Sequence, residues 1–160
     1  MTRNQLDLIL EPIGPGARLT VHPQRVAQFL GGRELRRIRT ATQLRKAVEA
    51  GLPVKSLEDL ASYMASSERG AAELKYQIVP KTTLLRRTRL TPQESERLER
   101  FARMVALAEQ VWEDRDLARE FLTSPQPQLD GERPVDLTRS DLGTRQVEDL
   151  LLKLEYALPV

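Results

Sequence analysis

The residues best suited to chemistry in this sequence are basic and hydroxyl side chains that follow Pro80. They are Lys81, Thr82, Thr83, Arg86, Arg87 and Arg89. Such side chains can donate hydrogen bonds to DNA phosphates and base edges. The spacing predicts a helix over 81–89, with Leu84 and Leu85 inward. A helix, a short helix over 70–76 and a turn at Pro80 precede it, and this order of elements indicates a helix-turn-helix. An ordinary helical bundle with a solvated basic face fits the same local pattern.

Most catalytic chemistry is disfavoured by composition. The sequence has no cysteine and a single histidine, His22, so thiolate nucleophiles and clustered zinc ligands are excluded. The run Gly14-Pro15-Gly16 lacks the Lys-Ser or Lys-Thr that completes a phosphate loop. Glu94 could pass for a catalytic carboxylate, but it is better explained as a helix cap. We therefore expect a protein that is not an enzyme, with no catalytic residue, metal, cofactor or small-molecule substrate.

Charge divides the 160-residue chain into unlike parts. The net charge is +2 overall, with +1 over 1–32, +7 over 33–90 and −6 over 91–160. A basic part can meet phosphate, whereas an acidic part is repelled by it, so the division indicates two surfaces with different partners. Two solvated domains with no such partners would show the same asymmetry.

Two further observations concern partners and location. A second basic cluster consists of Arg33, Arg36, Arg37, Arg39, Arg45 and Lys46. It is either a phosphate-facing strip or a solvated face. No apolar run approaches the ~20 residues that span a bilayer, and the first residues do not resemble a signal peptide. We expect a cytoplasmic protein with no membrane partner.

Helix signals run along most of the chain. The clearest is Thr91-Pro92-Gln93-Glu94, a capping box with proline at the first helical position, which predicts a helix to Trp112. Either Thr40 or Thr42 can begin an earlier helix, and Ser56 is predicted to cap another. Apolar residues from Leu142 to Leu158 predict a last helical stripe.

These signals predict an all-α fold. We expect an N-terminal arm or dimerisation element over 1–32, a helix-turn-helix domain over 33–89 and a second helical domain over 90–160.

The second domain resembles the Xre/MbcA/ParS antitoxins of bacterial type II toxin–antitoxin systems. Five segments carry the resemblance in the family's order: LTPQESERL at 90–98, FLTSPQPQL at 121–129, PVDL at 134–137, GTRQVEDLL at 143–151 and LEY at 154–156. Phe121 stands where the family often has tryptophan. Upstream, IVPKTTLLRR at 78–87 is similar to the turn and recognition helix of the family's Xre-like helix-turn-helix. The first 30 residues lie outside the resemblance.

The resemblance implies a function. Such antitoxins usually bind a RES-domain toxin that consumes NAD and obstruct its active site with the C-terminal domain. Many also form homodimers that bind operator DNA and repress their own operon. On this basis the expected toxin-binding residues are Glu148, Asp149, Glu155, Tyr156, Leu158, Pro159 and Val160, and the DNA-binding residues are those that follow Pro80.

Three alternatives stay open at this stage. The acidic helix residues could be solvated, and the last residues could be a frayed terminus. The protein could be a helix-turn-helix transcription regulator without a toxin partner. It could also be an interaction adaptor whose helix-turn-helix has lost DNA binding, because the turn at Tyr76–Val79 is bulky.

Overall fold

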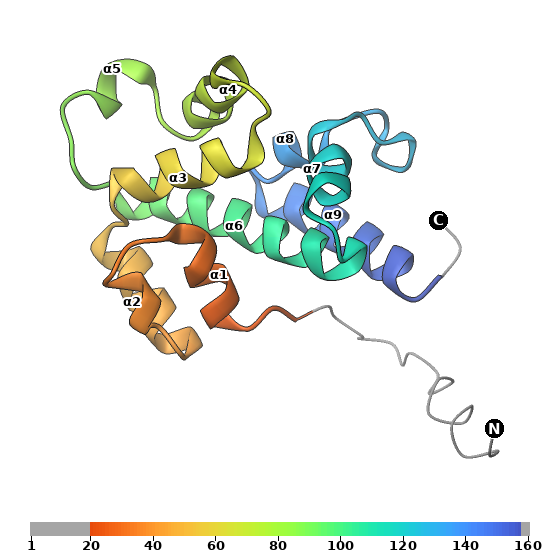
Figure 1. Ribbon diagram of the computed structural model, residues 1–160, viewed down its shortest axis with the longest axis horizontal. Helices are drawn as coiled ribbons and strands as arrows, with labels where there is room; N and C mark the ends of the chain where they lie inside the picture. The colour runs from red at the N-terminus through yellow and green to blue at the C-terminus, as the bar shows by residue number, and fades with distance from the viewer. Residues whose placement is uncertain (1–19, 158–160) are drawn as a thin grey trace.

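The 21-residue helix α6 (Pro92–Trp112) runs through the middle of the structure, with the other helices around it (Figure 1). The structure is a computed structural model that describes residues 20–157. Met104 to Ala108 are five consecutive residues that are each at most 1% exposed. A helix buried at consecutive positions is covered on every side. Helices α1 (Pro23–Leu30) and α2 (Ala41–Ala50) cover one stretch of α6, and α7 (Arg115–Thr123) and α9 (Asp141–Glu155) cover another.

Helix α6 begins where the sequence predicts. The Glu94 amide donates to Thr91 Oγ1 at 3.2 Å, and the Thr91 amide donates to Glu94 Oε2 at 2.8 Å. Ser95, which follows in the same motif, is fully buried, and its Oγ accepts a 2.8 Å hydrogen bond from the Leu52 amide. The motif therefore both starts the helix and satisfies a buried backbone group of a distant segment.

The charge on Glu94 contributes to this helix start. Burial alone would raise the pKa of Glu94, but hydrogen bonds from Thr91 and from Arg87 (2.9 Å) hold that pKa below its ordinary value. A carboxylate with a lowered folded-state pKa stabilises the fold above its unfolded-state pKa. That contribution is lost as pH falls through the folded-state pKa.

We therefore expect Glu94→Ala to lower the free energy of unfolding by about 1 kcal/mol at pH 7. The difference from the unsubstituted protein should shrink as pH falls through the lowered folded-state pKa of Glu94, because Glu94 then becomes protonated. Urea unfolding at pH 7 and over a series of acidic pH values measures this. The matched control is Glu96→Ala, which removes an exposed carboxylate in the same turn. An equal loss in both variants at pH 7 would contradict the capping role.

The N-terminal helices follow the predicted signals. Helix α1 (Pro23–Leu30) ends at Gly31, whose φ of 66° is readily adopted by glycine. A short 3₁₀ helix, η1 (Leu35–Arg37), then leads to α2 (Ala41–Ala50). Of the two threonines considered for the α2 cap, Thr40 makes the capping box.

Helices α3 (Val54–Met64) and α4 (Glu68–Ile78) correct two local predictions. Ser56 does not cap α3, because the helix already begins after Pro53, and Ser56 is a buried first-turn residue. Helix α4 is longer than the short helix expected from Gly70 to Tyr76. It starts earlier because Ser67 Oγ accepts the Gly70 amide at 3.1 Å.

Helix α5 (Lys81–Leu84) is a single turn, so the predicted helix over 81–89 was wrong. Leu84 is partly buried, whereas Leu85, predicted to point inward, is 81% exposed. Pro80 stands one residue before the helix, at its N-cap, and not inside its first turn.

The reason for the short helix is a tertiary contact. The chain before α6 pairs with the chain before α3 in an isolated antiparallel β-bridge between Pro53 and Arg89. Two backbone hydrogen bonds hold it, from the Val54 amide to the Thr88 oxygen (2.9 Å) and from the Leu90 amide to the Leu52 oxygen (2.8 Å). An extended backbone is needed for this pairing, so the helix cannot continue to residue 89.

Four helices complete the fold: α7 (Arg115–Thr123), η2 (Pro127–Leu129), α8 (Pro134–Leu137) and α9 (Asp141–Glu155). Phe101 is buried in the core as predicted. Trp112 is only partly buried and packs against Phe121 with ring centroids 6.0 Å apart. Leu142, predicted on the apolar stripe, is 75% exposed, because the buried side of the first turn of α9 is formed by Gly143 and Thr144 and Leu142 faces away from it. Leu158 and the predicted arm over 1–19 lie outside the described residues.

The all-α fold is confirmed for residues 20–157, where the regular elements are all helices. No helix of this part of the chain is long and apolar enough to cross a membrane.

Candidate functional site

The predicted DNA-binding residues divide into two groups in the structure. Lys81, Thr82 and Arg86 are exposed on and after α5, and Thr83 is partly buried beside them. Arg87 and Arg89 are instead engaged within the chain. These are the side chains that the sequence pattern grouped together, and the fold leaves only part of the group available for a ligand.

The engaged arginines hold the ends of neighbouring elements together. Arg87 pairs with the capping residue Glu94 at 2.9 Å. Arg89 donates to the Gly51 oxygen at 2.9 Å and pairs with Glu34 at 3.3 Å. Substituting either arginine would therefore disturb the fold as well as any DNA contact.

Helix α5 is held by the turn before it. Val79 is fully buried, whereas Tyr76, which was predicted to lie in the turn, is in the last turn of α4 and is 39% exposed. The Val79 amide donates to the Lys75 oxygen at 3.0 Å, and the Pro80 oxygen accepts the Thr83 amide at 3.0 Å. A buried anchor and an exposed turn give α5 a fixed position at the edge of the molecule, on the left in Figure 1.

The predicted toxin-binding residues from Glu148 to Tyr156 lie at the opposite end, along α9 and at its C-terminus (Figure 1). Glu148 is ion-paired with Arg103 of α6, and its side chain is 28% exposed. Asp149, Glu155 and Tyr156 are exposed. Leu158, Pro159 and Val160 lie outside the described residues. Of the expected acidic contacts, Asp149 and Glu155 are thus the more accessible.

A shallow recess lies beside these residues. It has a volume of about 460 Å³ and is lined by η2 and α9, including Leu129, Gln146, Asp149 and Lys153. The mixture of apolar, amide and charged groups can bind a peptide segment but presents no catalytic arrangement. Among the described residues, no group of histidines and carboxylates has the spacing of a metal site.

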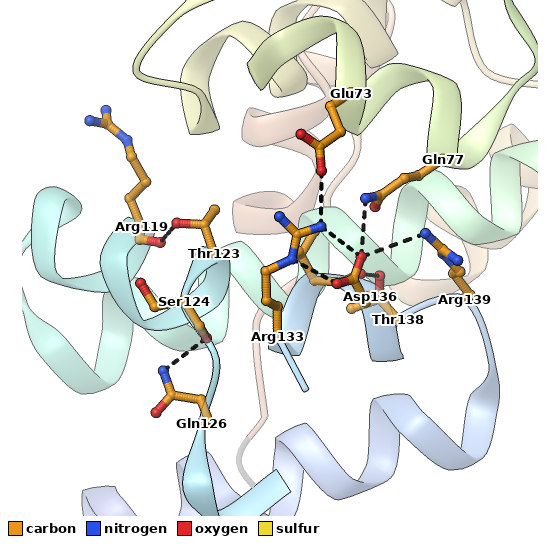
Figure 2. Close-up of polar contacts among 11 residues, drawn as sticks. Glu73, Gln77, Arg119, Thr123, Ser124, Gln126, Arg133, Asp136, Thr138 and Arg139 are labelled. Atoms are coloured by element: carbon orange, nitrogen blue, oxygen red, sulfur yellow. Dashed lines mark hydrogen bonds and ion pairs between the residues drawn. The ribbon is translucent and has the colours of Figure 1, made fainter. Parts of the chain in front are cut away.

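A polar network that sequence reasoning missed joins α4 to α8 (Figure 2). Arg133 Nε contacts Asp136 Oδ2 at 2.7 Å, and Arg133 Nη2 contacts Glu73 Oε1 at 3.0 Å. Gln77 Nε2 donates to Asp136 Oδ1 at 3.0 Å. Hydrogen bonds from Arg133 to Asp136 and Glu73 raise the pKa of Arg133 above its ordinary value. The PVDL motif contains Asp136, but no spacing pattern in the sequence indicates its partners Glu73, Gln77 and Arg133.

A second network joins α1, α3, α6 and α7. Tyr63 donates its hydroxyl hydrogen to Glu109, which also pairs with Arg25 at 3.4 Å. The Arg115 guanidinium stacks 3.9 Å from the centre of the Tyr63 ring. Burial, together with the Glu109 hydrogen bond, raises the pKa of Tyr63 to about 12. Tyr63 is therefore a neutral residue that packs within the chain.

The chain matches two models of known protein families. Residues 43–103 match the antitoxin Xre-like helix-turn-helix domain, and residues 107–157 match the antitoxin Xre/MbcA/ParS C-terminal toxin-binding domain. The chain belongs to the Xre-type antitoxin family. The helix-turn-helix match contains α5 with its exposed basic residues, and the toxin-binding match contains α7, α8 and α9.

A curated relative gives the same family. Antitoxin Xre of Pseudomonas putida is 37% identical over 82 residues, which are 49% of this chain and 52% of the relative. The chain thus aligns with about half the length of the curated relative it matches.

The two family matches adjoin inside α6, between residues 103 and 107. Helix α6 contacts both the N-terminal helices and α7 and α9, so one helix serves the two Xre-type modules. The expected division at residues 89 and 90 stays a prediction.

Proposed function

We propose that this protein is an antitoxin that binds a RES-domain, NAD-consuming toxin and covers its active site. The observation that carries the proposal is the order of the two family matches, a helix-turn-helix followed directly by a toxin-binding domain. The alternative, a transcription regulator without a toxin, gives no reason for the second domain. The same reasoning favours a protein that acts by binding and not by catalysis.

The toxin contact is proposed at the end of α9. Asp149 and Glu155 supply exposed negative charge for basic groups of the toxin, and Glu148 supplies more if it exchanges Arg103 for a toxin cation. Tyr156 is 49% exposed where α9 ends, so its ring is accessible and can be buried in an interface with a partner. Residues 158–160 follow it and are proposed to enter the NAD site.

The DNA contact is proposed at α5. Lys81, Thr82, Thr83 and Arg86 would meet phosphates and base edges of an operator, and binding there would repress the protein's own operon. A homodimer would place two α5 turns on two half-sites, because a two-fold symmetric protein matches a palindromic operator.

The antitoxin proposal is tested by co-expression with a RES-domain protein encoded beside the gene. We expect the RES-domain protein alone to stop growth, and co-expression to restore growth and yield a co-purifying complex. Toxicity that persists with no complex would remove the toxin half of the proposal and leave the regulator alternative.

The DNA proposal predicts a specific effect of Lys81→Ala combined with Arg86→Ala. Both side chains are exposed, so the fold should be retained. Operator affinity should fall at least about tenfold, and the slope of log affinity against log salt should decrease by about 2, because two phosphate contacts are lost. Fluorescence anisotropy on an operator duplex at several salt concentrations measures both.

Arg145→Ala combined with Lys153→Ala is the matched control, because it removes two exposed charges from α9 at the other end. Equal affinity of the α5 variant and the control would refute α5 as the recognition element. Toxin neutralisation should be intact in the α5 variant.

A further inference from the structure

The surface formed by α1, η1 and the start of α2 carries an unusual excess of positive charge. Glu34 is the only acidic residue between Thr20 and Val48, a stretch that holds seven basic residues. Glu34 is itself paired with Arg89, and two of the seven are also paired, Arg25 with Glu109 and Arg45 with Glu49, the first acidic residue after this stretch. The residues that give this surface its charge are Arg33, Arg36, Arg37, Arg39, Arg45 and Lys46, all exposed. We call them the η1 basic surface.

The fold turns these side chains outward. Leu35 and Ile38 are 2% and 6% exposed because they anchor the segment in the core. The arginines between and beside these two anchors must then face solvent. Arg39 is further fixed in place, because its Nη1 donates to the Arg36 oxygen at 2.6 Å and to the Ile38 oxygen at 3.0 Å. A guanidinium held by backbone oxygens loses little side-chain freedom when it binds a ligand.

The η1 basic surface borders a recess that has the donors for a phosphate. The recess has a volume of about 500 Å³ and is lined by Gln24 and Gln28 of α1 together with Arg36 and Arg39. No carboxylate of the described residues lines it. Two guanidinium groups and two amide groups can donate several hydrogen bonds to the oxygens of a phosphodiester.

Helix α2, which carries part of this surface, and α5 both lie on the left in Figure 1, with α3 and α6 between them, and an ion pair connects the chain after α5 to the surface. Arg89 follows Arg86 by three residues, which span at most about 11 Å of chain. Arg89 pairs with Glu34, the neighbour of Arg33, at 3.3 Å. A DNA duplex carries one charge per ~1.7 Å of its axis, so one duplex can present phosphates to both places.

We propose that the η1 basic surface binds the sugar–phosphate backbone of duplex DNA next to the site contacted by α5. The inference rests on the proposed operator binding and extends its footprint to a second surface. Arg33, Arg36, Arg37 and Arg39 precede residue 43 and lie outside both family matches. Contacts here go to phosphates and not to bases, so they increase affinity without selecting sequence.

The test is Arg36→Gln combined with Arg37→Gln, with Arg145→Gln combined with Lys153→Gln as the control of equal charge. Each protein is titrated against an operator duplex and an unrelated duplex of equal length at several salt concentrations. We expect the affinity of the η1 variant to fall at least about tenfold on both duplexes, and its slope of log affinity against log salt to decrease by about 2. The control should keep the affinity and the slope of the unsubstituted protein. The thermal midpoint should be unchanged, because both arginines are exposed.

The outcomes separate this inference from the proposed function. Operator binding by the unsubstituted protein with no change in the η1 variant would overturn the inference alone. Loss of binding only on the operator would assign the surface to base reading and overturn it too. If the η1 variant instead bound the toxin or a second copy of the chain more weakly, while its salt slope on DNA was unchanged, the surface would bind a protein partner. That result would overturn the inference. No binding of the unsubstituted protein to either duplex would overturn the DNA half of the proposed function as well.

Discussion

Replacing Gly143 with alanine is expected to destabilise the protein by about 3 kcal/mol or more, because the added methyl group overpacks a rigid contact. A Cβ atom at this position would lie 2.2 Å from the Leu137 carbonyl oxygen and 2.9 Å from its carbon. Both are backbone atoms of α8, so no side chain can rotate away. Relief requires α8 and α9 to separate, and the recess beside Asp149 would change with them. The glycine that opens the GTRQVEDLL motif therefore serves helix packing.

Gly70→Ala is the matched control, because Gly70 also lies in a helix. A Cβ atom added there would make only ordinary contacts, at 3.4 Å to Ser67 Oγ and 3.5 Å to the Ala65 side chain. There the substitution should leave the protein equally stable or stabilise it by about 0.5 to 1 kcal/mol, because alanine favours helix. Urea unfolding measures both variants. If the Gly143→Ala variant has the same free energy of unfolding as the unsubstituted protein, α8 and α9 do not pack as described.

Removing Tyr156 to Val160 is expected to abolish toxin neutralisation while leaving the fold and DNA binding intact. Tyr156 is 49% exposed and Ala157 is exposed, so the core loses little when they are removed. The segment follows the last turn of α9, where no later described element covers it. A growth-rescue assay with the RES-domain protein, together with a thermal midpoint, separates lost neutralisation from lost folding.

Leu142→Ala is the control for this truncation, because it removes an exposed apolar side chain from the other end of α9. The control should neutralise as well as the unsubstituted protein. A truncated protein that still protects cells would move the inhibitory contact to the helix faces around Asp149.

The all-α fold and several helix starts could be predicted because their causes are local. Thr91 and Glu94 exchange capping hydrogen bonds at the start of α6, where Pro92 removes one unpaired amide, and Thr40 and Gln43 form the same capping box for α2. Such capping geometry needs no knowledge of the rest of the chain.

The errors arose where a distant segment decides the local structure. The basic segment after Pro80 has helical spacing, yet the bridge between Pro53 and Arg89 requires extended backbone and ends α5 after one turn. The error at Leu142 has a different cause, because Leu142 lies five residues before Val147, whereas the buried residues Gly143 and Thr144 lie four and three residues before it. Helical periodicity thus assigns Leu142 to another side of α9 than the buried stripe.

The sequence predicts which residue types the candidate sites contain, but not which of these side chains are already engaged in ion pairs within the chain. Arg87 and Glu148 have suitable charge for DNA and toxin, but Glu94 and Arg103 already hold them. Those pairs join different segments, and no spacing rule in a single sequence indicates them.

The most direct test of the account is inhibition of the toxin's chemistry in solution. A purified RES-domain protein that consumes NAD is titrated with this protein, and the remaining NAD is measured over time. We predict that NAD consumption stops as the two proteins reach complex stoichiometry, and that the protein lacking Tyr156 to Val160 does not stop it. Undiminished NAD consumption in the presence of excess full-length protein would contradict the antitoxin account.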